Sequence, residues 1–220
     1  MSIQIIGNSG VITQVDGTTF RALRITSRPV GYGGLGSYRI AMLSGTMNAG
    51  LATASDVFQA RWTDATRLAL IWGVTLDGLG TATNFFGGYG SFNVFFARQW
   101  TADGSGGNPA TLTGNNQKLR TSMGTSFMSA IRLSATGALT AGTRTLDSQS
   151  LGQASFTLST LANFNFAVGP TPMYGAIDPS ENAYPIALTS NEGIVCQATV
   201  PGNGTWQFGI TMSWSEVVSY

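Results

Sequence analysis

Short runs of alternating apolar and polar residues, separated by Gly, Asn, Asp or Pro, recur along the chain. The clearest pattern lies near the C-terminus, where the run 194–200 is followed by the turn 201–204 and a second run, 206–215. A period of two places all the large side chains of such a run on one face of a β-strand. The pattern predicts two strands, which we expect to pair as a hairpin with one buried face.

Further strands are predicted upstream. The run 68–76 is almost wholly apolar, which is typical of a central strand buried on both faces. A short helix over 148–162 is an alternative for one segment, although Gly152 weakens it. The other predicted strands are 38–43, 57–62, 92–100, 127–134 and 155–166. About eight strands predict an all-β fold, namely a single-domain antiparallel β-sandwich, jelly-roll-like, with long Gly/Pro-rich loops.

No break in composition marks a second domain, so we expect one domain over residues 1–220, with 1–30 as an arm or an edge strand. Two long surface loops are predicted. The segment 101–118 is rich in Gly, Asn and Thr, and the segment 169–185 carries four of the seven prolines. Long ordered loops are often where a β scaffold makes its contacts.

Charge is sparse. Only 10% of the residues are charged, whereas a typical soluble domain has about 25%, and the net charge is +1. A surface with so few charges is poorly protected against association. We therefore expect partners to cover much of it, or hydroxyl and amide groups to keep it hydrated.

Several classes of function are disfavoured by composition. No basic run is present to bind nucleic acid through phosphates, and the longest apolar run is too short to span a membrane. The chain has no His, and its one cysteine, Cys196, allows neither an intrachain disulfide nor a Cys-based zinc site. The N-terminus lacks the features of a signal peptide. We expect no catalytic residue, no cofactor and no metal.

Four motifs offer candidate chemistry. The sequence 31–36 fits a dinucleotide-binding pattern, but a β-like run follows it where a helix is required, so we expect a loop. The sequence 103–108 offers a single carboxylate to Ca²⁺ and is expected to be a solvated turn. Glu192 and Glu216 would face each other across the C-terminal hairpin, as a glycosidase pair requires, but edge positions are favoured. The sequon 203–205 is expected to be a turn.

Arginine dominates the cations, and three arginines lie in or beside predicted strands: Arg61, Arg98 and Arg132. Arginine is enriched at interfaces and lysine is depleted there. These side chains either line the sheet edges or pair across subunit contacts, and both alternatives stay open. Three aromatic residues beside glycines, Phe85, Phe86 and Tyr89, are either an interface anchor or fold back onto the core. We treat all six as interface candidates.

Four blocks of sequence resemble a recurring group of tailed-bacteriophage proteins of unassigned function: 58–68, 118–126, 139–147 and 184–209. The resemblance covers much of the chain from residue 58 onward. It implies a virion structural protein, made in the host cytoplasm, that decorates or cements the capsid surface. It carries over no catalytic residue, because none is assigned in that group.

The leading hypothesis is thus a capsid decoration protein that forms a symmetric homo-oligomer, preferably a trimer, and binds a major capsid protein. The alternative is a tail- or fibre-associated module that binds host glycans, with Trp62, Trp72, Trp100 and the 85–89 aromatic residues stacking on sugar rings. An enzyme such as a glycan hydrolase is the least favoured hypothesis, since titratable groups are few.

Overall fold

A computed structural model describes residues 5–6, 12–13, 34–51, 54–83, 88–158, 170–175 and 185–218, with the backbone alone for 5–6, 12–13, 78–83 and 157–158. Every regular element in these residues is a β-strand. The strands are β1 (Ile5–Ile6), β2 (Ile12–Thr13), β3 (Gly36–Leu43), β4 (Ser55–Trp62), β5 (Leu68–Thr83), β6 (Gly88–Ala102), β7 (Asn108–Pro109), β8 (Ala130–Leu133), β9 (Thr143–Leu146), β10 (Gly152–Leu158), β11 (Thr171–Gly175), β12 (Ile186–Leu188), β13 (Glu192–Thr199) and β14 (Thr205–Val217).

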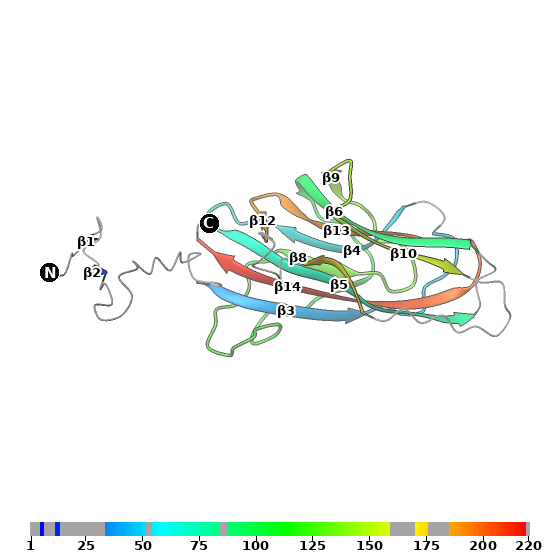
Figure 1. Cartoon of the computed structure of the whole chain (residues 1–220), viewed down its shortest axis with the longest axis horizontal. Helices are drawn as coiled ribbons and strands as arrows, with labels where there is room; N and C mark the ends of the chain where they lie inside the picture. Colours follow the sequence, from blue (N-terminus) through cyan, green and yellow to red (C-terminus); the bar gives the residue numbers. More distant parts are fainter. Residues whose placement is uncertain are drawn as a thin grey trace, which may run out of the picture.

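Two antiparallel sheets pack face to face (Figure 1), which confirms the predicted β-sandwich. One sheet has the strand order β10-β6-β13-β4-β8-β7, with β9 also paired to β6. The other has the order β11-β5-β14-β3, with β12 also paired to β5. Strands β1 and β2 pair with each other, and the described part of the N-terminal segment adds no strand to the edge of either large sheet.

The strand pairing is nested in the way that defines a jelly roll. Among the eight principal strands, β3 pairs with β14, β4 with β13, β5 with β11, and β6 with β10. Counted along the chain, the first of these eight strands therefore pairs with the eighth, the second with the seventh, the third with the sixth and the fourth with the fifth. This long folded hairpin places four strands in each sheet, as two interlocked Greek keys do.

The predicted C-terminal hairpin is wrong, although both of its strands exist. Strand β13 hydrogen-bonds to β4 and β6, whereas β14 lies in the opposite sheet between β3 and β5. The turn 201–204 therefore crosses from one sheet to the other. Alternation specifies which face of a strand is buried, but it does not specify the hydrogen-bonded neighbour.

The helix considered over 148–162 is also wrong in the described part of that segment. Gly152–Leu158 forms β10, which pairs residue by residue with β6. The glycine has a steric reason, because a Cβ at Gly152 would lie 1.4 Å from the backbone oxygen of Met173 on β11. Gly152 thus lets strands from opposite sheets approach at one corner of the sandwich.

Substitution of Gly152 by alanine is expected to lower the free energy of unfolding by about 1–3 kcal/mol, because the backbone of β10 or β11 must move. Urea denaturation measures the change. Gly137→Ala is the matched control, since a Cβ there meets no atom within 4 Å. Equal stability of the two variants would contradict the close approach.

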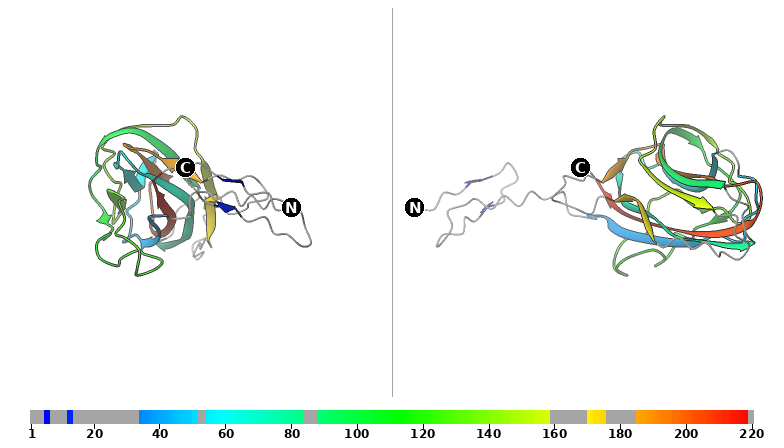
Figure 2. Two further views of the ribbon diagram at one scale, coloured as in Figure 1. Left: turned by 90° about the vertical axis from the view of Figure 1, so that its left-hand side faces the viewer. Right: turned by 45° about the vertical axis from the view of Figure 1, so that its right-hand side comes forward.

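Figure 2 shows the two sheets of the sandwich from two further sides. Aromatic rings fill the space between these sheets: Phe92 on β6 contacts Trp206 and Phe208 on β14, with ring centroids 5.8 and 5.4 Å apart. Near the other end, Tyr38 on β3 stacks on Trp214 at 5.3 Å. Strand β5 is central in its sheet, and most of its described side chains, in residues 68–77, are buried, as its apolar run predicts.

The predicted loops have mixed outcomes. Residues 103–107 and 110–118 are irregular and mostly exposed, as expected, with β7 between them. The segment 169–185 lies largely outside the described residues, but β11 falls within it. The Gly-rich motif 31–36 lies partly outside them too, and its last residue begins β3 rather than a helix.

Candidate functional site

An insertion between β6 and β10 builds the most elaborate surface of the described residues. After β6 ends, residues 103–151 turn back across the outer face of the sheet that contains β4, β6 and β13. Within this insertion, β8 pairs with β4 and extends that sheet. Gly106 and Gly107 adopt positive φ angles of 85° and 58°, which glycine tolerates best. The sandwich thus acquires a second layer of chain over one face.

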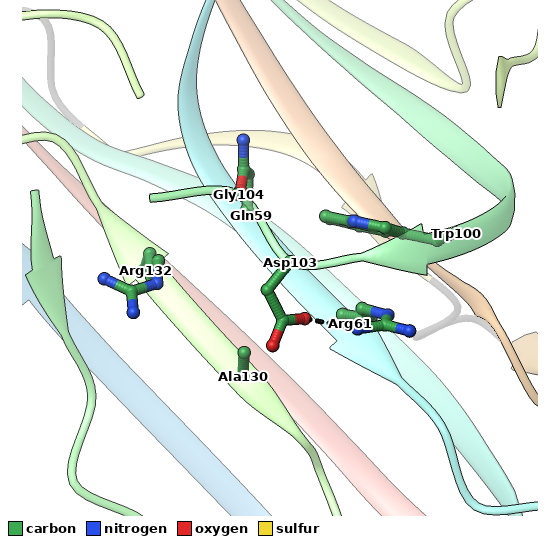
Figure 3. Close-up of a pocket in the computed structure, with 7 residues that line it drawn as sticks. All are labelled: Gln59, Arg61, Trp100, Asp103, Gly104, Ala130 and Arg132. Atoms are coloured by element: carbon green, nitrogen blue, oxygen red, sulfur yellow. Dashed lines mark hydrogen bonds and ion pairs between the residues drawn. The ribbon is translucent and has the colours of Figure 1, made fainter. Parts of the chain in front are cut away.

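Two of the predicted arginines meet at this insertion (Figure 3). Arg61 on β4 donates to the Oδ1 atom of Asp103 at 2.6 Å and to the Oδ1 atom of Asn191 at 3.2 Å. Arg132 on β8 lies on the other side of Asp103 and donates to the backbone oxygen of Gly106 at 3.1 Å. The Nε atoms of both arginines are buried without a hydrogen-bond partner.

Two hollows adjoin these side chains. A cavity of about 10 Å³, room for one water molecule, is lined by Gln59, Arg61, Trp100, Asp103, Gly104, Ala130 and Arg132. A groove of about 410 Å³ shares Asp103, Ala130 and Arg132 with it and is otherwise walled by 109–113 and 125–131. The groove offers one guanidinium, one carboxylate and several hydroxyls beside apolar side chains. Such a surface can hold a polar ligand or a partner's side chain.

A buried polar network ties the insertion to the outer face of the sheet. The carboxylate of Asp56 on β4 forms an ion pair with Arg144 on β9, and both side chains are at least 96% buried. Gln59 and Gln197 donate to the same carboxylate at 2.7 and 3.0 Å. Gln59 also donates to the backbone oxygen of Thr140 at 2.9 Å. These contacts fix the insertion in one position.

Arg98 lies apart from the other two arginines, near the end of β6. Its guanidinium pairs with Asp147 at 2.8 Å and with Glu192 at 3.1 Å, and it covers the ring of Phe96. The hydrogen bond from Arg98 holds the pKa of Asp147 below its usual range. Arg98 is half exposed, but its charge is already balanced within the chain.

The aromatic candidates divide by exposure. Trp62 and Trp100, proposed to stack on sugar rings, are fully buried, so that role is wrong for both. Trp72 is half-buried and donates to the hydroxyl of Ser215. Tyr89 is 56% exposed. Phe85 and Phe86 lie outside the described residues.

The two glutamates considered for catalysis do not face each other across a hairpin, because β13 and β14 belong to different sheets. Glu192 pairs with Arg98 and accepts the backbone N–H of Thr189 at 2.8 Å. Glu216 is fully buried, and it accepts hydrogen bonds from Ser126, Trp214 and the backbone of Phe127. Burial raises the pKa of Glu216 above its ordinary value.

Glu216 is expected to make stability pH-dependent in a defined direction. Its folded pKa is raised, so its contribution is fully present below the ordinary glutamate pKa and is lost as the pH rises through the folded value. The free energy of unfolding of the natural protein, relative to Glu216→Gln, should therefore fall as the pH rises above the ordinary glutamate range. Urea denaturation over a series of pH values measures it.

Asp147→Asn is the control for that series. Because the pKa of Asp147 is lowered, the natural protein should gain stability relative to this variant as the pH rises through the acid range. If the difference in free energy of unfolding between the natural protein and each variant changed with pH in the same direction, the assignment of a raised pKa to Glu216 would be contradicted.

The carboxylates of the described part are all engaged within the chain. Five form ion pairs with Arg61, Arg67, Arg98 or Arg144; they are Asp56, Asp64, Asp103, Asp147 and Glu192. Glu216 is buried, and Asp77 accepts a hydrogen bond from Thr211. No group of three His, Cys, Asp or Glu side chains that could hold a metal occurs among these residues. Four cations remain without a carboxylate partner there: Arg39, Lys118, Arg120 and Arg132.

Sequence reasoning missed the partners of the arginines. The sequence predicts a solvated turn at Asp103, and no local pattern links Asp56 to Arg144, which lies 88 positions away. One signal was available in the sequence, because Gln59 and Arg61 occupy alternate positions of a predicted strand. The structure buries both side chains.

No protein-family model matches the chain, and no curated protein sequence matches it. Within the described residues, the structure contains no helix long and apolar enough to cross a bilayer.

Proposed function

We propose that the chain is a structural component of a tailed-phage virion, a decoration or cement protein that binds the capsid surface and associates with copies of itself. The four sequence blocks that resemble tailed-bacteriophage proteins of unassigned function support this proposal. The jelly roll is compatible with it, because viral capsid domains use this fold, as do lectins and many enzymes. The surface of the protein must therefore carry the argument.

The observation that carries the proposal is the pairing of the carboxylates within the chain, together with the exposure of large apolar side chains. In the described part, every carboxylate is engaged within the chain, while Leu43, Leu119 and Val218 are each more than 60% exposed. Charged residues are depleted at the centre of protein interfaces, and exposed large apolar side chains mark association surfaces. A surface of this kind suits lasting protein contacts.

The ion pairs within the chain reduce the number of arginines that are free to pair with a partner protein. Arg61 and Arg98 have carboxylate partners in their own chain, so Arg132, beside the groove, is the interface candidate with an unmatched charge. Tyr89 is exposed enough to contact a partner directly. We propose a symmetric homo-oligomer, preferably a trimer, whose loops contact the major capsid protein.

Immunogold labelling of purified particles with an antibody against this chain tests the proposed function. Even labelling over the head is the expected result. Labelling of the tail tip alone would favour the glycan-binding alternative, and an absence of label would overturn the virion role.

One observation favours the second candidate, a glycan-binding module. The hydroxyl of Tyr89 lies 3.0 Å from that of Ser155 and 3.2 Å from the Nε2 atom of Gln153, both on the neighbouring strand β10. The exposed ring is therefore held across two strands, with amide and hydroxyl groups beside it. A glycan array probed with the natural protein and with Tyr89→Ala tests this surface; binding that is lost in the variant would establish it.

A further inference from the structure

The unmatched positive charge of the described part is concentrated at one edge of the sandwich. Three of its four unpaired cations lie where residues 117–120 of the insertion run beside the edge strand β3. Tyr38 opposes Lys118 in an antiparallel bridge, and the N–H of Arg39 donates to the oxygen of Gln117 at 3.0 Å. We call Arg39, Lys118, Leu119 and Arg120 the basic edge.

Leu119 gives the basic edge an apolar centre. Its backbone N–H donates to the oxygen of Ser37 at 3.1 Å, so the residue is fixed against β3, yet its side chain is 62% exposed. Arg39 and Arg120 are also exposed. An exposed apolar side chain next to cationic residues in the same segment is compatible with a protein contact, which has a desolvated centre and a polar rim.

We propose that the basic edge binds an acidic surface of a different protein. This inference rests on the proposed function, from which it follows that the partner is the protein that forms the capsid shell. Charge complementarity gives the partner its sign, because three cations here have no carboxylate partner in the described residues. Leu119 requires an apolar side chain among the partner's carboxylates.

A second copy of the chain is a poorer partner for this edge. Its seven described carboxylates are already engaged by arginines, by hydrogen bonds or by burial, so it has no free acidic group in that part to offer. Duplex DNA is also a poorer partner, because three cations on two adjacent segments do not form the extended basic face that phosphate binding uses.

The sequence provides an unusually selective chemical probe, because Lys118 is the only lysine in the chain. A carbodiimide joins an amine to a carboxylate that touches it. In purified particles, we expect Lys118 to form an amide with an Asp or Glu of another protein, identified by mass spectrometry. A link from Lys118 to a second copy, or acetylation of Lys118 as fast in particles as in the isolated chain, would overturn the docking proposal.

Two variants of equal net charge test the energetic role. Arg39→Gln/Lys118→Gln/Arg120→Gln removes three positive charges from the basic edge. Thr101→Glu/Ser149→Glu/Gln207→Glu adds three negative charges at exposed positions elsewhere. We expect the first variant to bind particles about tenfold more weakly and the second to bind as the natural protein does. Equal weakening of both would show a general effect of charge and overturn the proposal.

Absence of the natural chain from particles would overturn the proposed function but not, by itself, the docking inference. In that case, binding of labelled poly-L-glutamate by the isolated chain decides. Loss of binding in the basic-edge variant alone supports the inference. Equal binding by all three proteins overturns it, as does tighter binding to duplex DNA or to phosphatidylserine vesicles than to poly-L-glutamate.

Discussion

Phe92→Ala is expected to lower the free energy of unfolding by about 3–5 kcal/mol. Phe92 lies between the sheets and contacts the rings of Phe156, Trp206 and Phe208. Its removal leaves a cavity among three rings that belong to both sheets, and packed rings cannot close such a space fully. Urea denaturation followed by tryptophan fluorescence measures the loss.

Tyr89→Ala is the matched control on the same strand. Tyr89 is 56% exposed and points away from the core, so its loss should change stability by less than about 1 kcal/mol. A loss of similar size in the two variants would contradict the assignment of the inner and outer faces of β6.

Asp56→Ala is expected to destabilise the protein by about 3–5 kcal/mol, because the buried guanidinium of Arg144 would lose its counter-charge. The amides of Gln59 and Gln197 would lose an acceptor at the same time. Because Arg144 lies in the insertion, local opening of 139–147 should accompany the loss. Hydrogen exchange measures that opening, and urea denaturation measures the global change.

The double variant Asp56→Leu/Arg144→Met separates the charge from the packing. Apolar replacement of a buried ion pair is often close to neutral, so the double variant should be more stable than Asp56→Ala. An exposed-pair variant, Asp147→Ala, should destabilise the protein much less than Asp56→Ala does, because exposed ion pairs contribute little. A small effect of Asp56→Ala would show that the insertion is not held by this pair.

The sequence predicts where the strands lie better than it predicts which strands pair by hydrogen bonds. Alternation found β14 because Trp206, Phe208 and Ile210 share one face, and an unbroken apolar run identified β5. Neither pattern contains the hydrogen-bond partner of a strand, so the C-terminal pair was placed in one sheet when it spans two. Gly152 illustrates the same limit, because its reason lies in the backbone of β11, which is distant in sequence.

The candidate site was only partly predictable for a related reason. Arg61 and Arg132 stood out as arginines in strands, and the structure places them on either side of Asp103. Their partners come from a long insertion whose path no local pattern indicates. The basic edge was not predicted at all, since Arg39 and Lys118 become neighbours only through a short ladder between β3 and the insertion.

We propose that lasting protein contacts cover a large share of this surface. Sedimentation equilibrium of the isolated chain over a wide concentration range measures whether it associates. We expect a mass that is at least twice, and a whole-number multiple of, 23.0 kDa, held across the range by a closed assembly. A soluble species of 23.0 kDa at every concentration would contradict it.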